Sequence, residues 1–384
     1  MDGALRGPPH PPDPRRLAVS ATSPRLVYPD LLRIIAMLAV VTLHVAMRDL
    51  QRVRLGSAEW QLMNLYDGAA RWCVPIYVMV SGLFLLRPGR NADDLRTAYR
   101  KTFGRALRLA SILVIRSLVY QVFLLRATRV PLTARGAVAG LWDMWFGPIY
   151  YHLWFLYMLV PLYFLAPLVQ LFIARTEPHH WRTVVVVLGI GGPVLTFATS
   201  LVAIYSGQGM YRPMPEFSGY LFYFFLGWWL GQTEWSSRQR RGLYLAGLLG
   251  VTINVGGTAW ASSATGTFNE TFYNYLTLPT AAAAMAIFVA VKQVAAGLDP
   301  SPRMRRLVEQ FSAVTLGIYL IHPALIETFF RLTDLTVRQA PVPVVVMVPA
   351  VSLLVFVASM LGAWLARRVI RALPRGKDWV GWVM

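Results

Sequence analysis

Apolar residues in this chain are grouped into runs long enough to cross a lipid bilayer, and polar stretches separate the runs. A helix rises about 1.5 Å per residue, so about 20 predominantly apolar residues span the hydrocarbon layer. The pattern predicts ten helices, at residues 27–47, 72–87, 107–126, 153–174, 183–205, 217–231, 242–261, 272–293, 310–330 and 342–366. The second and sixth are short for a membrane span, so we expect them to be tilted or extended by flanking polar turns.

The overall composition is typical of a polytopic membrane protein. Hydrophobic residues make up 56% of the 384 positions, and the mean hydropathy is +0.49. A soluble domain with a single core does not carry apolar runs along its whole length. We therefore expect an all-α membrane helix bundle of about ten transmembrane helices at residues 27–366, surrounded by membrane lipids. Residues 1–26 are expected to form a disordered tail, and residues 367–384 a basic tail.

The 37 Lys and Arg residues are divided unequally between the two sides of the predicted bundle. With the N-terminus inside, the segments on that side carry 25 of them, whereas the opposite loops, such as that from Arg48 to Arg71, carry 10. Because cytoplasmic loops are enriched in these residues, both termini are predicted to be cytoplasmic. The net charge of +19 then reflects topology and contact with anionic lipid headgroups, and we expect no nucleic-acid partner.

The first predicted helix contains Arg33 and His44, and ionisable residues inside a membrane indicate a functional site because they are costly there. Eleven residues separate them, close to three helical turns, so both lie on one face and about 16 Å apart along the axis. Alternatively, each lies near one helix end and reaches the nearer interface. Asp30 either holds the Arg33 guanidinium in place or forms a simple ion pair at the helix start.

A second group of cations lies in and around the third predicted helix. Arg105 and Arg108 share a face at spacing i and i+3, which suits phosphate groups, although the positive-inside distribution alone also explains them. Arg116 lies eight residues beyond Arg108 and about 12 Å deeper, within an apolar run. A lipid-facing arginine is costly at that depth, so we expect Arg116 to face the bundle interior, in a functional or a structural network.

Two further candidates belong to segments with unusual local structure. Ser81 and Gly82 are small residues in the second predicted helix, where another helix or a ligand can approach closely, and helix packing is the commoner explanation. His322 is followed by Pro323, which lacks a backbone N–H and so frees a carbonyl group in the helix. The sequence therefore favours a kinked, polar-lined site around His322.

Aromatic residues gather where the fourth predicted helix begins, and Trp154 is one of them. Such a cluster is typical of the interfacial belt of membrane proteins. His152 in the same cluster is expected at the depth of His44, so the two imidazoles would line a single polar opening. Cys73 is the only cysteine and no two histidines have the spacing of a zincin motif, so we expect no metal site.

Taken in order, these segments resemble acyltransferase family 3, a bacterial family of ten-helix membrane acyltransferases. The resemblance covers about residues 27–366 and rests on Asp30-x-x-Arg33, His44, Ser81-Gly82, Arg105-x-x-Arg108, His152-Leu-Trp-Phe-Leu156 and Gly317 to His322. The chain looks most similar to stand-alone O-acetyltransferases of surface polysaccharides. This resemblance implies cytoplasmic acetyl-CoA as donor, a hydroxyl of a glycan or lipid-linked sugar as acceptor, and the inner (plasma) membrane as location. Leu83 departs from the family pattern, because many members carry an aromatic residue there.

The chemistry of acyl transfer gives these residues expected roles. A base that titrates near neutral pH takes the proton of the acceptor hydroxyl, and His44 fits this role. Arg105 and Arg108 are expected to hold the CoA phosphates, with Arg33 further along the path. An extended pantetheine arm is comparable in length to the helical rise of about 16 Å between Arg33 and His44, so the donor could reach from one to the other.

The remaining candidates are assigned to the reacting groups and to the acceptor. Arg116 is expected to stabilise the oxyanion of the tetrahedral intermediate. Ser81, His152, Trp154 and His322 are expected to line the substrate site.

A polysaccharide exporter or flippase is the main alternative, because such a transporter also uses intramembrane Arg and His residues. The chain has no strong internal repeat, and its basic residues concentrate at one predicted mouth, which favours the enzyme. A scaffold or receptor would not explain why Arg33 and His44 share a helix face.

Overall fold

The computed structural model describes residues 27–88, 94–127, 133, 140, 142–144, 146–206, 216–333 and 343–373. The predicted N-terminal tail and the residues after 373 lie outside this description. The basic segment predicted as a tail from residue 367 begins inside the last helix, which continues to Ala372.

Helices account for all regular secondary structure in these ranges. In chain order they are α1 (Tyr28–Leu50), α2 (Ala58–Ala70), α3 (Cys73–Leu85), α4 (Leu95–Ala127), α6 (Trp154–Arg175), α7 (Pro178–Gly189), α8 (Leu195–Ser206), α9 (Glu216–Gln232), α10 (Ser237–Thr265), α11 (Leu278–Ala296), α12 (Pro302–Ser312), α13 (Thr315–Thr333) and α14 (Val344–Ala372). Short helical turns precede α6, join α7 to α8 and precede α11; they are η2 (Tyr151–Leu153), η3 (Ile190–Val194) and η4 (Thr271–Tyr273).

Each of the ten predicted segments coincides with one of these helices or with a consecutive pair. In the described ranges, eight helical stretches are long and apolar enough to cross a membrane, and α12 with α13 forms a ninth that is bent by 51°. The segment predicted at 217–231 is α9, which has 17 residues. The all-α multi-pass bundle predicted from the hydrophobic pattern is therefore confirmed.

The second predicted helix is part of a longer, broken span. α2 and α3 together cover Ala58–Leu85, whereas the sequence predicted a helix only from residue 72, after a polar loop. Asn64 and Asp67 lower the hydropathy of α2, yet both side chains are buried inside the bundle. Arg71, predicted to lie in the loop, occupies the break between α2 and α3 and is only 7% exposed.

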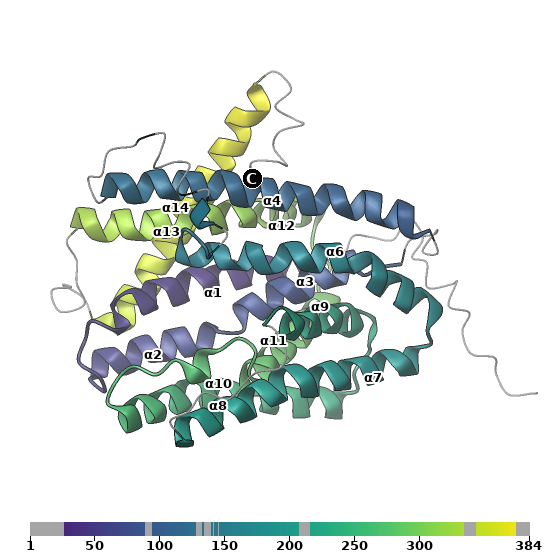
Figure 1. Ribbon diagram of the computed structural model, residues 1–384, viewed down its shortest axis with the longest axis horizontal. Coiled ribbons are helices and arrows are strands. Elements are labelled where there is room, and N and C mark those ends of the chain that lie inside the picture. The colour runs from purple at the N-terminus through teal and green to yellow at the C-terminus, as the bar shows by residue number, and fades with distance from the viewer. Residues whose placement is uncertain are drawn as a thin grey trace, which may run out of the picture.

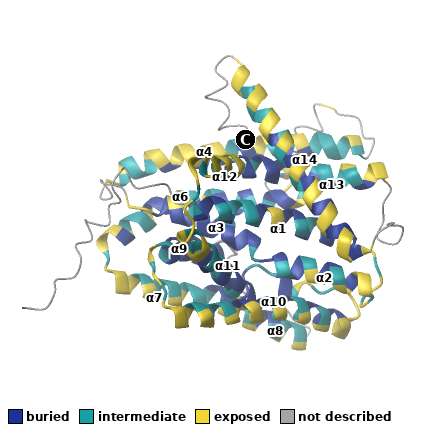
Figure 2. Ribbon diagram, turned by 180° about the vertical axis from the view of Figure 1, so that it is seen from behind, coloured by how far each residue is buried: buried dark blue, intermediate teal, exposed yellow. Residues whose placement is uncertain are grey.

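α1 and α3 occupy the interior of the bundle. Figure 1 shows them between α4 along the upper edge and α7 and α8 along the lower edge. In Figure 2 the buried colour is concentrated on α3, α9 and α11, whereas α7 and α10 carry long exposed stretches. Most residues of α3 are buried against neighbouring helices, which places this helix inside the bundle.

Two glycines let α3 and α9 pack at very short range. A Cβ atom added at Gly82 would lie 1.7 Å from the Phe224 carbonyl oxygen, and one at Gly227 would lie 2.0 Å from the Met79 carbonyl oxygen. Close helix packing therefore accounts for Gly82 in the Ser-Gly segment. The following Leu83 is fully buried against α9, so the departure from the family pattern lies in this packing.

The ninth span is broken between α12 and α13, where the helix axes differ by 51°. Non-helical backbone inside a membrane needs other partners for its polar groups. Thr315 Oγ1 donates to the Ser312 carbonyl oxygen at 2.8 Å, and a guanidinium nitrogen of Arg367 donates to the Ala313 carbonyl oxygen at 3.3 Å. These bonds stabilise a bend that opens space beside the start of α1.

Candidate active site

An elongated cavity of about 320 Å³ runs beside α1, between α1, α3, α6 and α13. Its lining includes Arg33, Ser81 and Ser312 toward one end and His44, His152 and Trp154 toward the other. The helical rise between Arg33 and His44 is about 16 Å, roughly half the thickness of the hydrocarbon layer. The two ionisable residues that the sequence places on one helix face therefore line one cavity.

Arg33 is fixed at its end of the cavity by two neighbouring segments. Its Nη1 donates to Asp30 Oδ1 at 3.4 Å, and the same carboxylate oxygen accepts a hydrogen bond from the Ser312 hydroxyl at 2.6 Å. The Tyr77 hydroxyl donates to the Arg33 carbonyl oxygen at 2.7 Å. The Arg33 side chain is 30% exposed and that of Asp30 is 2% exposed. Asp30 thus orients the guanidinium and ties α1 to the break between α12 and α13.

Two more arginines lie near this mouth of the cavity. The guanidinium carbons of Arg33 and Arg87 are 4.9 and 5.5 Å from the centre of the Phe84 ring, which is exposed. Arg105 precedes the cavity-lining Leu109 by about one helical turn, so both project from one face of α4. Guanidinium groups around an exposed ring suit the phosphates and base of a nucleotide.

The arginines predicted on α4 lie outside the cavity lining. Arg105 and Arg108 are exposed, so they can contact only the part of a ligand that extends out of the bundle. Arg116 is half-buried one turn before Tyr120, and it lies near enough to His152 for the two side chains to interact electrostatically. Arg116 can therefore act on a group in the cavity through His152.

His44 and His322 form a direct hydrogen bond between α1 and α13. His44 Nδ1 is 2.8 Å from His322 Nε2, and the two rings are stacked with centroids 5.1 Å apart. His322 is fully buried, whereas His44 lines the cavity. The structure thus places His322 behind His44 rather than on the cavity wall.

A backbone carbonyl determines the direction of this hydrogen bond. His322 Nδ1 is 3.1 Å from the Ile318 carbonyl oxygen, and because a carbonyl only accepts, a neutral His322 carries its proton on Nδ1. His322 Nε2 then accepts, and His44 Nδ1 donates. A neutral His44 in this pair consequently has an unprotonated Nε2, which is the state that a general base requires.

His152 lies beside the pair and is enclosed by aromatic side chains. Its ring centroid is 4.8 Å from that of Tyr120, 5.2 Å from that of Tyr319 and 5.9 Å from that of His322. The residue is 2% exposed and lines the cavity, and among the described residues neither ring nitrogen has a hydrogen-bond partner. An unpartnered buried imidazole is costly, so a group bound in the cavity is its natural partner.

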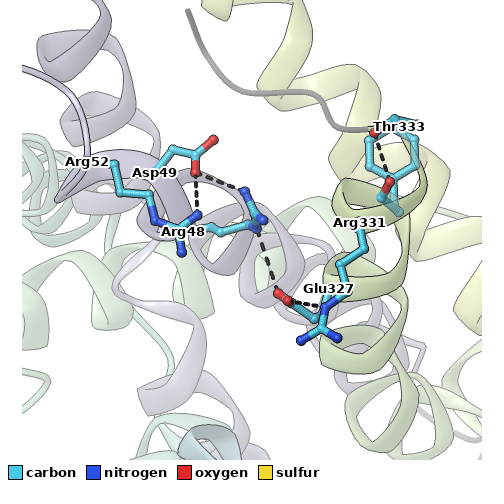
Figure 3. Close-up of polar contacts among 7 residues, drawn as sticks. Arg48, Asp49, Arg52, Glu327, Arg331 and Thr333 are labelled. Carbon is cyan, nitrogen blue, oxygen red and sulfur yellow. Dashed lines mark hydrogen bonds and ion pairs between the residues drawn. The ribbon is translucent and has the colours of Figure 1, made fainter. Parts of the chain in front are cut away.

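A network of ion pairs joins α1 to α13 about one turn beyond the histidine pair (Figure 3). Arg48 Nε is 3.9 Å from Glu327 Oε2, and Arg48 Nη1 donates to Asp49 Oδ1 at 2.9 Å. Arg331 Nε donates to the other oxygen of Glu327 at 2.7 Å, and the Arg48 guanidinium lies 4.2 Å from the centre of the Phe330 ring. The network holds the two helices together about one helical turn from the imidazoles.

Most sequence-predicted site residues meet at this cavity. Six of them surround or support it, namely Asp30, Arg33, Ser81, His44, His152 and Trp154. Arg87 and the pair of Arg48 and Glu327 are not among the site residues predicted from the sequence. Arg48 follows His44 by four residues and so shares its helix face, which is a signal that could have identified it.

In the part of the chain that the structure describes, no group of three His, Cys, Asp or Glu side chains is arranged to hold a metal ion.

A protein-family model matches the chain over nearly its whole length. The model, described as an acyltransferase domain, matches residues 26–368. No curated protein and no solved structure matches the chain. With this match, the chain belongs to acyltransferase family 3 and is a multi-pass membrane acyltransferase.

Proposed function

We propose that the protein transfers an acetyl group from acetyl-CoA to a hydroxyl of a cell-surface or lipid-linked sugar. One observation carries the proposal: an elongated cavity leads from a guanidinium at Arg33 to a hydrogen-bonded pair of histidines at His44. Transfer from an acyl-CoA donor requires groups that bind the CoA phosphates and a base that takes the proton of the acceptor hydroxyl. The two ends of the cavity offer one of each. The predicted topology places the Arg33 end on the cytoplasmic side of the plasma membrane, where acetyl-CoA is found.

The donor would enter with its phosphates at the mouth of the cavity. Arg33, Arg87 and Arg105 lie around that mouth, and each can make charge-assisted hydrogen bonds to phosphate oxygens. The pantetheine arm would follow the apolar lining formed by residues such as Met37, Val40 and Leu109. The thioester then reaches the end of the cavity that His44 lines.

The transfer step needs no reagent besides the acyl-CoA donor, the acceptor hydroxyl and the side chains of the protein. His44 Nε2 takes the proton of the acceptor hydroxyl while the hydroxyl oxygen attacks the thioester carbonyl carbon. The new C–O bond forms, the C–S bond breaks, and His44 returns the proton to the sulfur, so that free CoA thiol leaves. His322 Nε2 accepts the Nδ1 hydrogen of His44 and so stabilises the positive charge on the imidazole during the step.

His152 is the residue that we assign to the oxyanion. It lines the cavity next to the histidine pair, and its one ring N–H is available to donate a hydrogen bond to a bound group. Arg116 would favour this interaction by its charge, acting through His152. Arg116 is therefore a positioning residue in this proposal.

Binding and slow hydrolysis of radiolabelled acetyl-CoA test the proposal, with purified wild-type protein and His44→Ala in nanodiscs. We expect both proteins to bind acetyl-CoA and only the wild type to release labelled acetate. Unchanged release by His44→Ala would contradict the role of His44. A well-folded wild type that does not bind acetyl-CoA would contradict acetyl-CoA as the donor.

A further inference from the structure

A second cavity, of about 530 Å³, adjoins the first beyond Trp154 and Tyr275, which line both cavities. It lies between α6, α8, α9 and the segment that joins α10 to α11. Its lining also includes Arg71, Ala203, Tyr220, Asn269, Glu270 and Asn274. Cavities of this size hold small organic ligands. A ligand here would meet the donor only at the two shared rings.

Aromatic faces form one wall of this second cavity. Trp154 and Tyr275 are stacked, with centroids 5.7 Å apart and planes 24° apart, and the Tyr220 centroid is 5.8 Å from that of Trp154. An aromatic face packs against apolar C–H groups, and the polar tips of tyrosine and tryptophan also form hydrogen bonds. Such a wall suits a ring that has C–H groups on its faces and polar groups on its edge.

Two amides present hydrogen-bond donors to the same space. Asn269 Oδ1 accepts from the Thr271 backbone N–H at 3.0 Å, and Asn274 Oδ1 accepts from the Leu276 backbone N–H at 2.8 Å. These bonds fix both side-chain amides with the oxygen toward the backbone. The N–H groups of both amides are left for a ligand, which must then offer acceptor oxygens.

Arg71 supplies a buried charged group, and its charge is already balanced. The residue is 7% exposed, and its Nη2 is 2.6 Å from the carboxylate of the fully buried Asp67. Its Nε has no hydrogen-bond partner among the described residues. The exposed carboxylate of Glu270 lines the same cavity, so the charged groups named here carry no net positive charge. An anionic ligand such as a phosphate gains little here, whereas a neutral polyhydroxylated one can use every group.

We propose that this second cavity binds the acceptor as a neutral pyranose ring, with one hydroxyl directed past the edges of Trp154 and Tyr275 toward His44. The inference deepens the proposed acyl transfer and rests on it for the identity of the reaction. The ring stacks on the aromatic wall, its hydroxyl oxygens accept from the two asparagine amides and Arg71, and its hydroxyl hydrogens are donated to Glu270. The donor and the acceptor then approach the shared rings from opposite sides.

Saturation-transfer NMR on protein in nanodiscs tests this site directly. The probes are the methyl α-glycosides of glucose, galactose, mannose, rhamnose and N-acetylglucosamine. Ala203→Trp fills the cavity from α8, whereas Val202→Trp places the same ring on the neighbouring exposed position of α8, which is 46% exposed in the wild type. We expect wild type and Val202→Trp to give a saturation-transfer signal with at least one glycoside. For Ala203→Trp this signal should be at least fivefold weaker, while the variant still binds acetyl-CoA.

A milder pair of variants guards against misfolding of Ala203→Trp. Glu270→Ala is expected to weaken glycoside binding at least threefold, whereas Glu177→Ala, an exposed glutamate beside α7, leaves it unchanged. Equal saturation-transfer signals from wild type, Ala203→Trp and Glu270→Ala would overturn the inference. So would a wild type that gives no signal with any of the five glycosides.

The same measurements separate this inference from the proposed function. If the wild type binds a glycoside but neither binds nor hydrolyses acetyl-CoA, the sugar site stands and the proposed acyl transfer fails. If the wild type hydrolyses acetyl-CoA while Ala203→Trp binds glycosides normally, acyl transfer stands and this site is wrong.

Discussion

His44 donates a hydrogen bond to His322 across 2.8 Å, and the Ile318 carbonyl on the far side of His322 sets its direction. The two histidines are separated by 278 positions in the chain and come from the first and the ninth predicted spans. An imidazole oriented by a second buried group is the arrangement that catalytic bases use in other acyl-transfer enzymes. The relationship therefore connects the packing of α1 against α13 with the protonation state of the cavity-lining nitrogen.

Replacement of His44 tests the base. We expect His44→Ala to lower kcat for acetyl transfer by about 100-fold to 10,000-fold, the usual contribution of general base catalysis. The Kd for acetyl-CoA should stay close to that of the wild type, because the phosphates are proposed to bind about 16 Å away at the Arg33 end. Single-turnover transfer and equilibrium binding provide the measurements. His179→Ala, at an exposed histidine, is the matched control and keeps wild-type rates.

Replacement of His322 separates a positioning role from a purely structural one. His322→Leu removes the acceptor for His44 Nδ1–H, and we expect kcat to fall about 10-fold to 100-fold while the KM for acetyl-CoA changes little. His322→Gln can present its side-chain oxygen near the position of Nε2, so it should recover a large part of that loss. Equal kcat values for the Leu and Gln variants would show that the hydrogen bond does not matter.

The ion pair between Arg48 and Glu327 is expected to support the same geometry. Arg48→Ala should lower kcat about fivefold, which corresponds to about 1 kcal/mol, because the pair is partly buried and joins the helices that carry the histidines. Glu327→Gln should lower kcat to a similar extent, because it removes the carboxylate that pairs with Arg48. Arg52→Ala is the control, since Arg52 contacts the same Asp49 but its side chain is 67% exposed. Identical rates for the two alanine variants would argue against this role.

Much of the fold follows from the hydrophobic pattern, because each span carries its own signal. The ten predicted segments all coincide with helices, and the helical period places Arg33 and His44 on one face as the structure has them. α2 was missed since its polar residues, Asn64 and Asp67, look like loop residues until other helices bury them. A local pattern cannot report which polar groups find partners far away in the chain.

The site was predictable only in part for the same reason. The sequence gives no sign that His322 lies behind His44, because that contact depends on how α13 packs against α1. Arg87 belongs to the basic residues that the positive-inside rule already explains, so only its position beside Phe84 distinguishes it. The second cavity has no motif at all, since its lining comes from several separate segments.

Arginines at the mouth are expected to set the affinity for the donor. Arg87→Gln and Arg105→Gln should each raise the Kd for acetyl-CoA about tenfold, because each removes a charge-assisted contact to phosphate. The effect should shrink as salt concentration rises. Arg100→Gln is the control, an exposed arginine on the same helix as Arg105. A variant whose Kd equals that of Arg100→Gln would remove its arginine from the donor site.

The close packing of α3 and α9 makes a prediction about stability. A methyl group at Gly82 would collide with the backbone of Phe224, so Gly82→Ala should destabilise the protein by about 1–3 kcal/mol. Gly256→Ala, where the added methyl meets open space, should be neutral or slightly stabilising. The buried Cys73 is the only cysteine, so its reaction with a fluorogenic thiol reagent reports unfolding on heating. Equal melting temperatures would contradict the packing.

The position of the stacked rings of Trp154 and Tyr275 bears on how the proposed transfer responds to the membrane potential. With the predicted topology, the two cavities would open on opposite sides of the membrane, and much of the transmembrane potential would then fall across these two rings. Moving one elementary charge through a potential of 100 mV changes the free energy by about 2.3 kcal/mol, so the rate of a step that carries net charge would depend on the membrane potential. In the proposed reaction CoA loses its acetyl group and gains the proton of the acceptor hydroxyl, so neither CoA nor the acceptor changes its charge and no net charge crosses. The thioester alone would then drive the proposed transfer, which we expect to proceed equally well in a depolarised cell.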